Sequence, residues 1–250
     1  MSAVSQKVFL ISHTPDPEQL VATASKLCYS DADIESLQAG VEARDQSRFL
    51  GKLIEMGHLS PVEHASFTFG VEGVSRSLLA QLTRHRIASF SVKSQRYVGA
   101  LSDGGTFSYV VPEGVARLGA DAVRRFEEQM AQMQAWYDGW VSQLGENEAG
   151  YEDARFVLPN AAETKLIVTM NARELMHFFH LRCCNRAQWE IRALAWEMLR
   201  LAKTAAPALF AKAGPPCVSG GCTEGKMTCG KIKEVRQKYD EMFGEKCEPK

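Results

Sequence analysis

The sequence predicts an α+β protein in which a mixed antiparallel sheet packs against long helices in a single domain. Residues 67–74 alternate between apolar and polar side chains, and residues 164–171 are rich in β-branched side chains, so both are expected to be strands. Longer stretches at 113–144 and 187–212 are expected to be helices. The helices outnumber the strands and do not alternate regularly with them, which argues against a doubly wound sheet.

The N-terminal part of the chain predicts one strand and two helices. The strand is expected at residues 7–12 and the first helix at 17–29. Asp45 is expected to cap a second helix that ends at Gly57. The segment Ser60-Pro61-Val62-Glu63 has the form of a capping box, in which Ser60 caps and Glu63 reaches back to it. It therefore predicts a short helical turn.

The rest of the chain also contains patterns typical of helices and strands. The further elements expected are a helix at 75–86, a strand at 107–111, and helices at 151–158 and 173–183. After residue 213 the composition changes to Gly, Lys and Cys. We expect 1–213 to form the functional domain and 214–250 to be a poorly packed tail.

The composition is that of an ordinary globular protein, which we expect in the cytoplasm. The chain has 250 residues, of which 45% are hydrophobic and 24% charged, and its formal net charge is −1. A charge so near zero argues against a generic nucleic-acid coat. The apolar runs are far shorter than the ~18 residues that span a bilayer, and no secretory signal is expected. The seven cysteines, an odd number, fit reduced thiols.

The window from Gly73 to Ser102 contains five basic residues and no Asp or Glu. These residues are Arg76, Arg84, Arg86, Lys93 and Arg96. Guanidinium groups match the oxygens of phosphate two at a time, so the window favours a bound phosphorylated small molecule. The simpler alternative is a solvated basic face. No phosphate-binding glycine loop of a known mononucleotide or dinucleotide type is present, so side chains would have to hold the ligand.

The same window contains Arg84-His85-Arg86 and then, after seven residues, Ser94. This arrangement resembles the signature of the flavin-dependent thymidylate synthases. Further segments resemble that family in its own order, namely Gly57-His58-x-Ser60-Pro61-x-Glu63-His64, Gln81-x-x-Arg84, Ser94-Gln95-Arg96-Tyr97, Tyr151-Glu152-x-Ala154-Arg155-x-Val157-Leu158-Pro159, Asn171-Ala172-Arg173-x-Leu175-Met176, and Leu181-Arg182 followed by Ala187-Gln188-Trp189-Glu190. The resemblance covers roughly residues 7–212.

The resemblance implies a reaction, cofactors and an assembly. The family methylates dUMP to dTMP, with methylenetetrahydrofolate as carbon donor and NADPH as reductant through FAD. It implies a mixed α/β fold that is unrelated to the cysteine-dependent thymidylate synthases. It also implies a homotetramer whose active sites are built from several subunits, without nucleic-acid or membrane partners.

The resemblance assigns the substrate site residue by residue. The positions that match dUMP ligands are Gln81, Arg84, Ser94, Gln95, Arg96, Arg155 and Arg182. Arg182 is the residue we expect to be catalytic, because a fixed cation beside the uracil favours ionisation at N3 and makes C5 more nucleophilic. Ser94 is expected to bind the phosphate rather than to act as a nucleophile, because no Asp-His relay is evident beside it.

The resemblance also assigns the flavin site. The positions that match FAD contacts are Ser60, Glu63, Arg84, His85, Arg86, Asn171, Arg173 and His177. His58 matches a histidine near the flavin face and the folate site. Two positions depart from the family: His177 replaces an expected asparagine, and Val92 replaces a glutamate that some relatives carry.

Cysteine and metal chemistry provide alternatives. Cys183 and Cys184 follow Arg182 directly, so a thiolate nucleophile is conceivable, although free cysteines are commonly small core residues. In the tail, Cys217, Cys222, Cys229 and Cys247 lack the C-x2-C spacing of common zinc sites. We therefore expect no metal there.

Two rival functions follow from other features. A single-stranded nucleic-acid binding module would use the basic window with Phe90 and Tyr97 as stacking platforms. A helical metal site would use Glu174, His177 and His180, which follow one another at intervals of three residues. Neither rival explains the ordered set of family segments.

Overall fold

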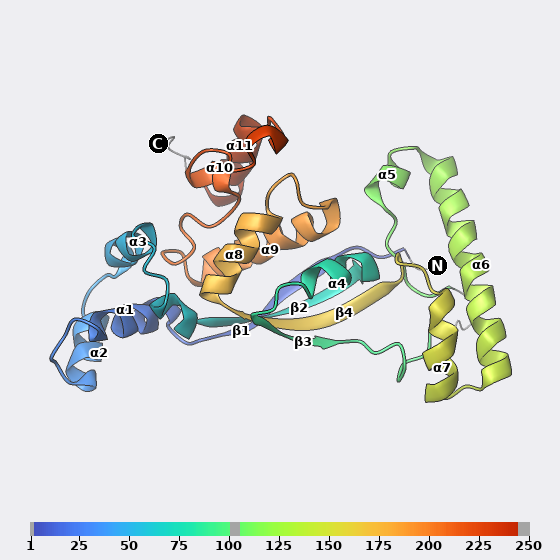
Figure 1. Ribbon diagram of the computed structural model, residues 1–250, viewed down its shortest axis with the longest axis horizontal. Coiled ribbons are helices and arrows are strands. Elements are labelled where there is room, and N and C mark those ends of the chain that lie inside the picture. The colour runs from blue at the N-terminus through green and yellow to red at the C-terminus, as the bar shows by residue number, and fades with distance from the viewer. Residues whose placement is uncertain (1–2, 101–105, 245–250) are drawn as a thin grey trace. The chain divides into compact units, whose positions relative to one another are not determined.

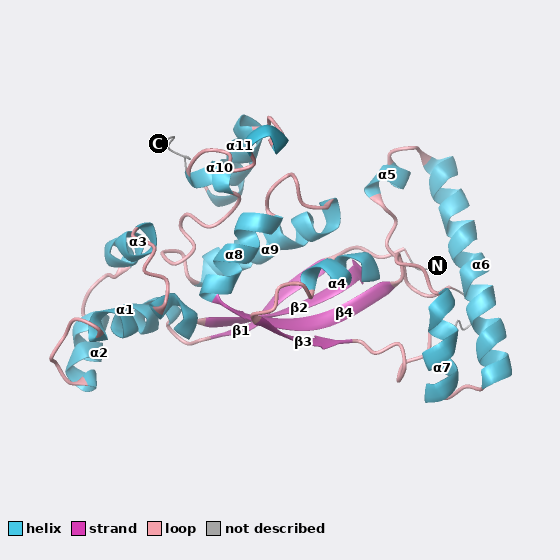
Figure 2. Ribbon diagram, viewed as in Figure 1, coloured by secondary structure: helices cyan, strands magenta, loops and turns pink. Residues whose placement is uncertain are grey.

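The computed structural model describes residues 3–100 and 106–244 (Figure 1). Within these residues four strands form one sheet in the order β1-β2-β4-β3 (magenta in Figure 2). The strands are β1 (Lys7–His13), β2 (Ser66–Ser75), β3 (Ala88–Val92) and β4 (Glu163–Asn171). The α+β class and the antiparallel sheet predicted from the sequence are confirmed.

Contacts near both ends of β1 and β2 show that these two strands run antiparallel. The Thr14 N–H donates to the Ser66 carbonyl at 2.9 Å, whereas Lys7 pairs with Glu72 towards the other end of β2. The hydroxyls of Thr68 and Thr169 are 2.9 Å apart, which sets the register of β2 against β4. Such contacts fix which side chains of each strand face the core.

The chain divides into two compact units, and the single domain stays a prediction. The first unit contains the described residues of Met1–Lys7, Gly70–Arg84 and Phe90–Ile167. The second unit contains the described residues of Val8–Phe69, His85–Ser89 and Val168–Lys250.

In the first unit, a long helix packs against a short one. Its helices are α4 (Arg76–Leu82), α5 (Glu113–Ala116), α6 (Ala120–Leu144) and α7 (Glu148–Ala154). Helices α6 and α7 lie side by side (Figure 1). Tyr137 of α6 is fully buried, and its hydroxyl accepts the Ala100 N–H at 3.0 Å. Gln134, one turn earlier, donates to the Ala100 carbonyl and accepts from the Phe107 N–H. The long helix thereby satisfies the polar backbone of an irregular segment.

In the second unit, aromatic side chains form the centre of the core. Its helices are α1 (Pro17–Leu27), α2 (Ile34–Glu42), α3 (Ser47–Glu55), α8 (Ala172–Arg182), α9 (Trp189–Ala205), α10 (Pro216–Ser219) and α11 (Ile232–Phe243). Phe67 of β2, Phe179 of α8 and Phe210 are buried. The Phe210 ring is 5.3 Å from Phe67 and 5.9 Å from Phe179, edge-on to both. This geometry is favourable for aromatic pairs.

Three predictions in the N-terminal part are corrected. Helix α2 was not predicted, and Asp33 caps it by accepting the Ser36 N–H at 2.8 Å. Asp45 does not cap α3, although it accepts the N–H of Ser47. The capping box at Ser60 does not form. Residues Pro61–His64 make a short 3₁₀ turn without a side-chain cap, and Glu63 pairs with Arg173 instead.

Further predictions are corrected in the middle of the chain. Strand β3 was not predicted, and residues 107–111 form no strand but only isolated bridges of Tyr109 to Ala3 and Ala162. The helix predicted at 113–144 is divided into α5 and α6 at Gly119, whose φ of 97° is incompatible with a helix. The helix predicted at 75–86 ends at Leu82.

The prediction of a poorly packed tail is wrong, while the boundary at residue 213 stays a prediction. Tyr239 of α11 is only 2% exposed, and its hydroxyl accepts from Lys203 at 2.7 Å and donates to the Ala211 carbonyl at 2.8 Å. Arg236 donates to the carbonyls of Cys217 and Gly220, both at 2.8 Å. The tail is thus joined to the second unit by packing and by buried hydrogen bonds. None of the described helices has the length and apolar character needed to cross a membrane.

We predict that the tail stabilises the second unit through Tyr239. Tyr239→Ala is expected to lower the free energy of unfolding by about 3–5 kcal/mol, because it removes a buried ring. Tyr239→Phe is expected to cost about 1–3 kcal/mol, because it leaves the Lys203 amine with one partner fewer. Urea unfolding measures both values, with Tyr29→Ala, at a side chain 79% exposed, as the control. An unchanged unfolding midpoint for Tyr239→Ala would contradict the prediction.

Candidate functional site

A cavity of about 730 Å³ opens in the second unit beside the first turns of α8. Its lining residues are Leu59, Glu63, Ile87, Asn171, Arg173, Glu174, Met176, His177 and His180. Four of the residues predicted to contact FAD are among them: Glu63, Asn171, Arg173 and His177. Residues separated by more than a hundred positions in the sequence are therefore brought to one cavity.

Helix α8 presents different side chains to the cavity and to the core. Arg173, His177 and His180 are exposed and recur at helical spacing, whereas Phe178 and Phe179 are fully buried. The side chain of Asn171 caps the helix by accepting the Glu174 N–H at 2.8 Å. This cap sets where the helix begins, and so which side chains reach the cavity.

Glu63 and Arg173 form an ion pair at the cavity. The Nη1 of Arg173 donates to Oε1 of Glu63 at 2.5 Å. Both side chains are about half exposed, so the pair is worth little net energy. An anion bound in the cavity would therefore compete for Arg173 at small cost.

His85 lies buried against one face of α8. Its Nδ1 is 3.1 Å from Oε1 of Glu174, and Nε of Arg182 donates to its Nε2 at 3.1 Å. The ring of Phe178 packs edge-on against the imidazole, with 4.9 Å between centroids. Burial lowers the pKa of His85, and the charge of Arg182 lowers it further, although the contact with Glu174 opposes the change. These surroundings therefore favour the neutral form of His85.

The first unit contains a smaller cavity of about 210 Å³. Of the predicted dUMP ligands, Gln95 lines it, together with the basic residues Arg76 and Lys93. Arg76 donates from Nη2 to the Lys93 carbonyl at 3.2 Å, while its Nε is buried without a hydrogen-bond partner among the described residues. Burial lowers the pKa of Arg76, and the positive charge of Arg155 adds to the effect. Arg155, another predicted dUMP ligand, is therefore close enough to the smaller cavity for its charge to affect Arg76.

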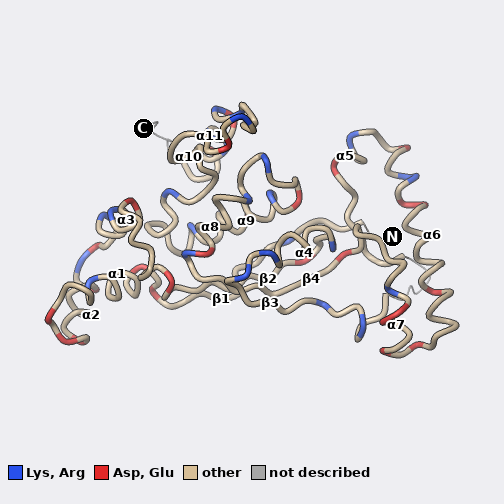
Figure 3. The backbone as a smooth tube through the Cα atoms, in the orientation of Figure 1, with Lys and Arg blue, Asp and Glu red and all other residues tan. Residues whose placement is uncertain are grey.

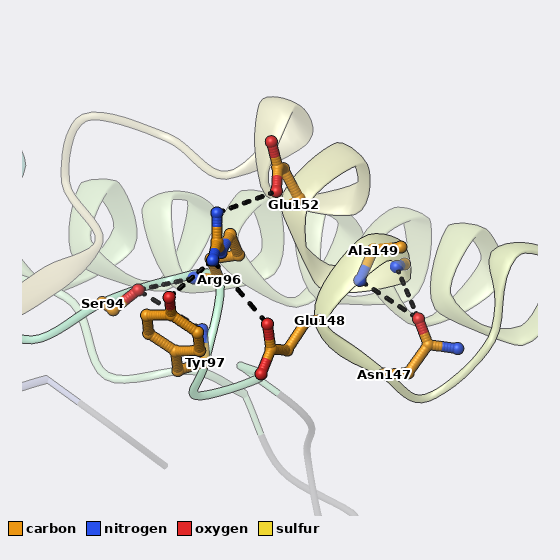
Figure 4. A network of polar contacts seen from close by, with 8 residues as sticks. Ser94, Arg96, Tyr97, Asn147, Glu148, Ala149 and Glu152 are labelled. Atoms are coloured by element: carbon orange, nitrogen blue, oxygen red, sulfur yellow. Dashed lines mark hydrogen bonds and ion pairs between the residues drawn. The ribbon is translucent and has the colours of Figure 1, made fainter.

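Arg96 is held by acidic residues of α7 (Figure 4). Glu148 and Glu152 each lie 3.7 Å from its guanidinium, which stacks over the Tyr97 ring at 4.6 Å. The Ser94 hydroxyl accepts the N–H groups of Arg96 and Tyr97 and so shapes the turn. Acidic residues are drawn in red along α7 in Figure 3. The basic window has no acidic residue within itself, but Arg96 finds its partners more than fifty residues later.

Most of the remaining predicted site residues do not line a cavity. Those that line neither of the two cavities are Ser60, Gln81, Arg84, Arg86, Ser94, Arg96, Arg155, Arg182, His58 and His85. Arg84 and Arg86 are exposed on either side of the buried His85. The His58 ring meets Tyr29 edge-on at 6.3 Å. Among residues the resemblance did not assign, Glu174 and Arg76 stand out. Arg76 carried a signal because it lies in the basic window, and Glu174 carried one only as a candidate metal ligand.

Burial argues against Cys183 as a nucleophile. Cys183 is fully buried, and burial raises the pKa of its thiol well above the ordinary value, which disfavours a thiolate. No group of three or more His, Cys, Asp or Glu residues among the described positions is arranged to hold a metal ion. Glu174 contacts His85 instead of joining His177 and His180 in a metal site. Cys247 lies outside the described residues.

Comparison with known proteins agrees with the resemblance seen in the signature segments. Residues 9–208 match the sequence model of the family described as thymidylate synthase complementing protein. The chain belongs to this family. It is 56% identical over 236 residues to a flavin-dependent thymidylate synthase from Geobacter sulfurreducens, covering 94% of this chain and 99% of that protein.

More distant relatives carry the same name. The chain is 48% identical to a flavin-dependent thymidylate synthase from Clostridium tetani, covering 93% of this chain and 96% of that protein. It is 38% identical to one from Pyrococcus furiosus, covering 94% of this chain and 97% of that protein. The similarity thus extends over nearly the full length of each protein.

We predict that His85 makes stability depend on pH. Its pKa is lower in the folded protein than the ~6.5 of an unfolded histidine, so the unfolded state binds the proton first as pH falls. The free energy of unfolding is therefore expected to fall as pH drops below about 6.5. Urea unfolding between pH 5 and 8 measures this, and His85→Asn is expected to show a smaller fall than the wild type. Parallel curves for the two proteins would contradict the prediction.

Proposed function

We propose that this protein methylates dUMP to dTMP, taking the carbon from methylenetetrahydrofolate and the reducing equivalents from NADPH through FAD. Family membership and the ordered signature segments support this function. The structural observation that supports the proposal most strongly concerns residues of the second unit. Four predicted flavin contacts line one cavity, and Glu174 of that cavity is hydrogen-bonded to His85 of the Arg84-His85-Arg86 signature.

The larger cavity fits FAD in size and in chemistry. A volume of about 730 Å³ lies within the range of ~300–1,000 Å³ typical of small-molecule sites. Leu59, Ile87 and Met176 supply apolar surface for a flat ring system, and Arg173 supplies donors for an anionic group. Asn171, His177 and Glu63 complete the set that would hold the cofactor. When bound, FAD supplies the redox chemistry that passes reducing equivalents from NADPH.

The turn after β3 in the first unit is the proposed phosphate site of dUMP. Ser94, Gln95 and Arg96 would bind the phosphate with Arg155, while Gln81 and Arg84 would contact the nucleoside. Arg96 can exchange its acidic partners for phosphate, because exposed ion pairs contribute about 0–1 kcal/mol. A charge-assisted bond to a phosphate oxygen contributes about 1.5–3 kcal/mol. The exchange therefore favours the bound substrate.

Arg182 is the proposed catalytic residue. A cation beside the uracil stabilises the anion that develops when N3 ionises, which raises the nucleophilicity of C5. The Nε of Arg182 is already committed to His85, so its direction is set before any substrate binds. A preoriented cation costs no reorganisation during the reaction.

We propose a homotetramer, in which several subunits contribute to each active site. Exposed apolar side chains support an assembly in both units. Phe9 and Ile11 are exposed on β1 in the second unit, and Trp136, Trp140 and Phe156 are exposed in the first. Apolar surface of this kind commonly marks protein interfaces.

The six described cysteines are free thiols, which supports the cytoplasm as the location.

An absorption spectrum of the purified protein tests the function. We expect a flavin spectrum that bleaches on addition of NADPH, and faster when dUMP is present. Such coupling would place nucleotide and flavin in one working site. A colourless protein that takes up no added FAD would overturn the proposal and favour single-stranded nucleic-acid binding, for which salt-dependent binding of an oligonucleotide is the direct assay.

We predict that Arg182→Ala loses turnover but not flavin. The rate constant kcat for dTMP formation is expected to fall by about 10²–10³-fold, the usual cost of removing a group that stabilises a developing anion. Flavin content, measured from absorbance after release of the cofactor, is expected to stay at the wild-type level. Arg200→Ala on α9, where Arg200 pairs with Glu197 at the surface, is the matched control. Equal losses of flavin and turnover in Arg182→Ala would contradict the assignment.

A further inference from the structure

Glu174 is a buried carboxylate for which the family resemblance gives no role. It is only 8% exposed, although it lines the larger cavity. Carboxylates are seldom buried to this degree unless they are paired. Its carboxylate lies 3.1 Å from Nδ1 of His85, and His85 is only 5% exposed. Packing alone therefore does not explain why these two polar side chains are buried together.

The donors and acceptors of this cluster allow only one arrangement of protons. A guanidinium group only donates, so Nε2 of His85 must accept from Nε of Arg182. The proton of the neutral imidazole must then lie on Nδ1, and Oε1 of Glu174 accepts it. A protonated imidazole would turn an N–H towards another N–H. The three side chains thus form a directed chain from Arg182 through His85 to Glu174.

Helix α8 gives this chain its rigidity. Glu174, Phe178 and Arg182 are spaced at four residues and so share one face of the helix. His85 contacts all three, through two hydrogen bonds and one edge-on ring contact. The backbone N–H of Glu174 is fixed by the Asn171 cap. The imidazole therefore lies along a preformed face.

The charges that face His85 support the same arrangement. They come from Glu174 and Arg182, both on α8, and the titratable His177 faces His85 from the same helix. Glu174 places one negative charge across the imidazole from the positive charge of Arg182. Without it, Arg182 would face a histidine free to adopt the other tautomer, in which Nε2 carries a proton and cannot accept.

We propose that Glu174 is a positioning residue that holds His85 in its Nδ1–H tautomer and, through it, orients the guanidinium of Arg182. The effect on turnover rests on the proposed function, because it acts through the proposed role of Arg182. The effect on the tautomer does not. The two parts can therefore be tested separately on the same variants.

Glu174→Leu removes the acceptor, whereas Glu174→Gln keeps an acceptor of the same size and removes the charge. We expect Glu174→Leu to lower kcat by about 10- to 100-fold, as is common when the partner that orients a functional histidine is lost. The KM for dUMP is expected to change little, because the misoriented group acts in the transition state. Glu174→Gln is expected to recover most of the rate.

The tautomer is read directly by NMR of the flavin-loaded protein labelled with ¹⁵N only in histidine. The chain has six histidines, and the His85 signals are assigned by their loss in His85→Gln. We expect wild-type His85 to show the Nδ1–H pattern and Glu174→Leu to show the Nε2–H form or a mixture. Glu18→Gln is the matched control, since Glu18 accepts the backbone N–H of Ala208 in the same unit and has no contact with His85 among the described interactions.

Each outcome decides one part of the proposal. An unchanged tautomer in Glu174→Leu would overturn the role of Glu174, whatever the rate. An altered tautomer with wild-type kcat would overturn the connection to Arg182. If Glu174→Leu does not fold, Glu174→Met decides, because it keeps the length of the side chain and also removes the acceptor. Loss of the Nδ1–H pattern relative to Glu18→Gln supports the proposal, and a wild-type pattern overturns it. A wild-type protein that makes no dTMP would refute the proposed function, while the NMR result would still test the tautomer.

Discussion

The burial of His85 against one face of α8 is the constraint on which the site in the second unit depends. A neutral imidazole with an acceptor on one side and a donor on the other can be buried only if both of its nitrogens are satisfied. Glu174 and Arg182 satisfy them from positions two helical turns apart, and Phe178 fills the space between. The same helix places Arg173 and His177 at the cavity. Moving α8 along its axis would therefore break the buried contacts and the cavity together.

The sequence predicted well those elements that have one buried face and one exposed face, because their apolar side chains then recur at regular spacing. Strands β2 and β4 alternate because one face of each is buried, and α8 and α9 are long enough for their apolar spacing to be evident. The errors have local physical causes. Residues 107–111 look like a strand because Phe107, Tyr109 and Val110 are buried, but α6 rather than a sheet satisfies part of their backbone. The tail is polar overall, and single residues such as Tyr239 provide its attachment.

The candidate site was predictable in its residue types but not in its pairings. Spacing within the signature segments indicated which residues belong together, and four of the predicted flavin contacts do line one cavity. The partners of the charged residues are distant in sequence: Glu63 lies 110 residues from Arg173, and His85 lies 89 residues from Glu174. Periodicity carries no information about such contacts, because they depend on how strands and helices are brought together. For this reason the sequence suggested Glu174 only as a member of a rival helical metal site, and not as the partner of His85.

The two kinds of charged contact in this protein have different physical roles. The pairs of Arg173 with Glu63 and of Arg96 with Glu148 and Glu152 are exposed, so water screens them and little energy is lost when an anionic ligand replaces the carboxylates. The contact of Arg182 with His85 is partly buried and ends on a buried carboxylate, so breaking it would leave polar groups unsatisfied. Exposed pairs suit arginines that must exchange partners when ligands bind. A buried chain suits an arginine whose direction must stay constant while the charge on its ligand changes.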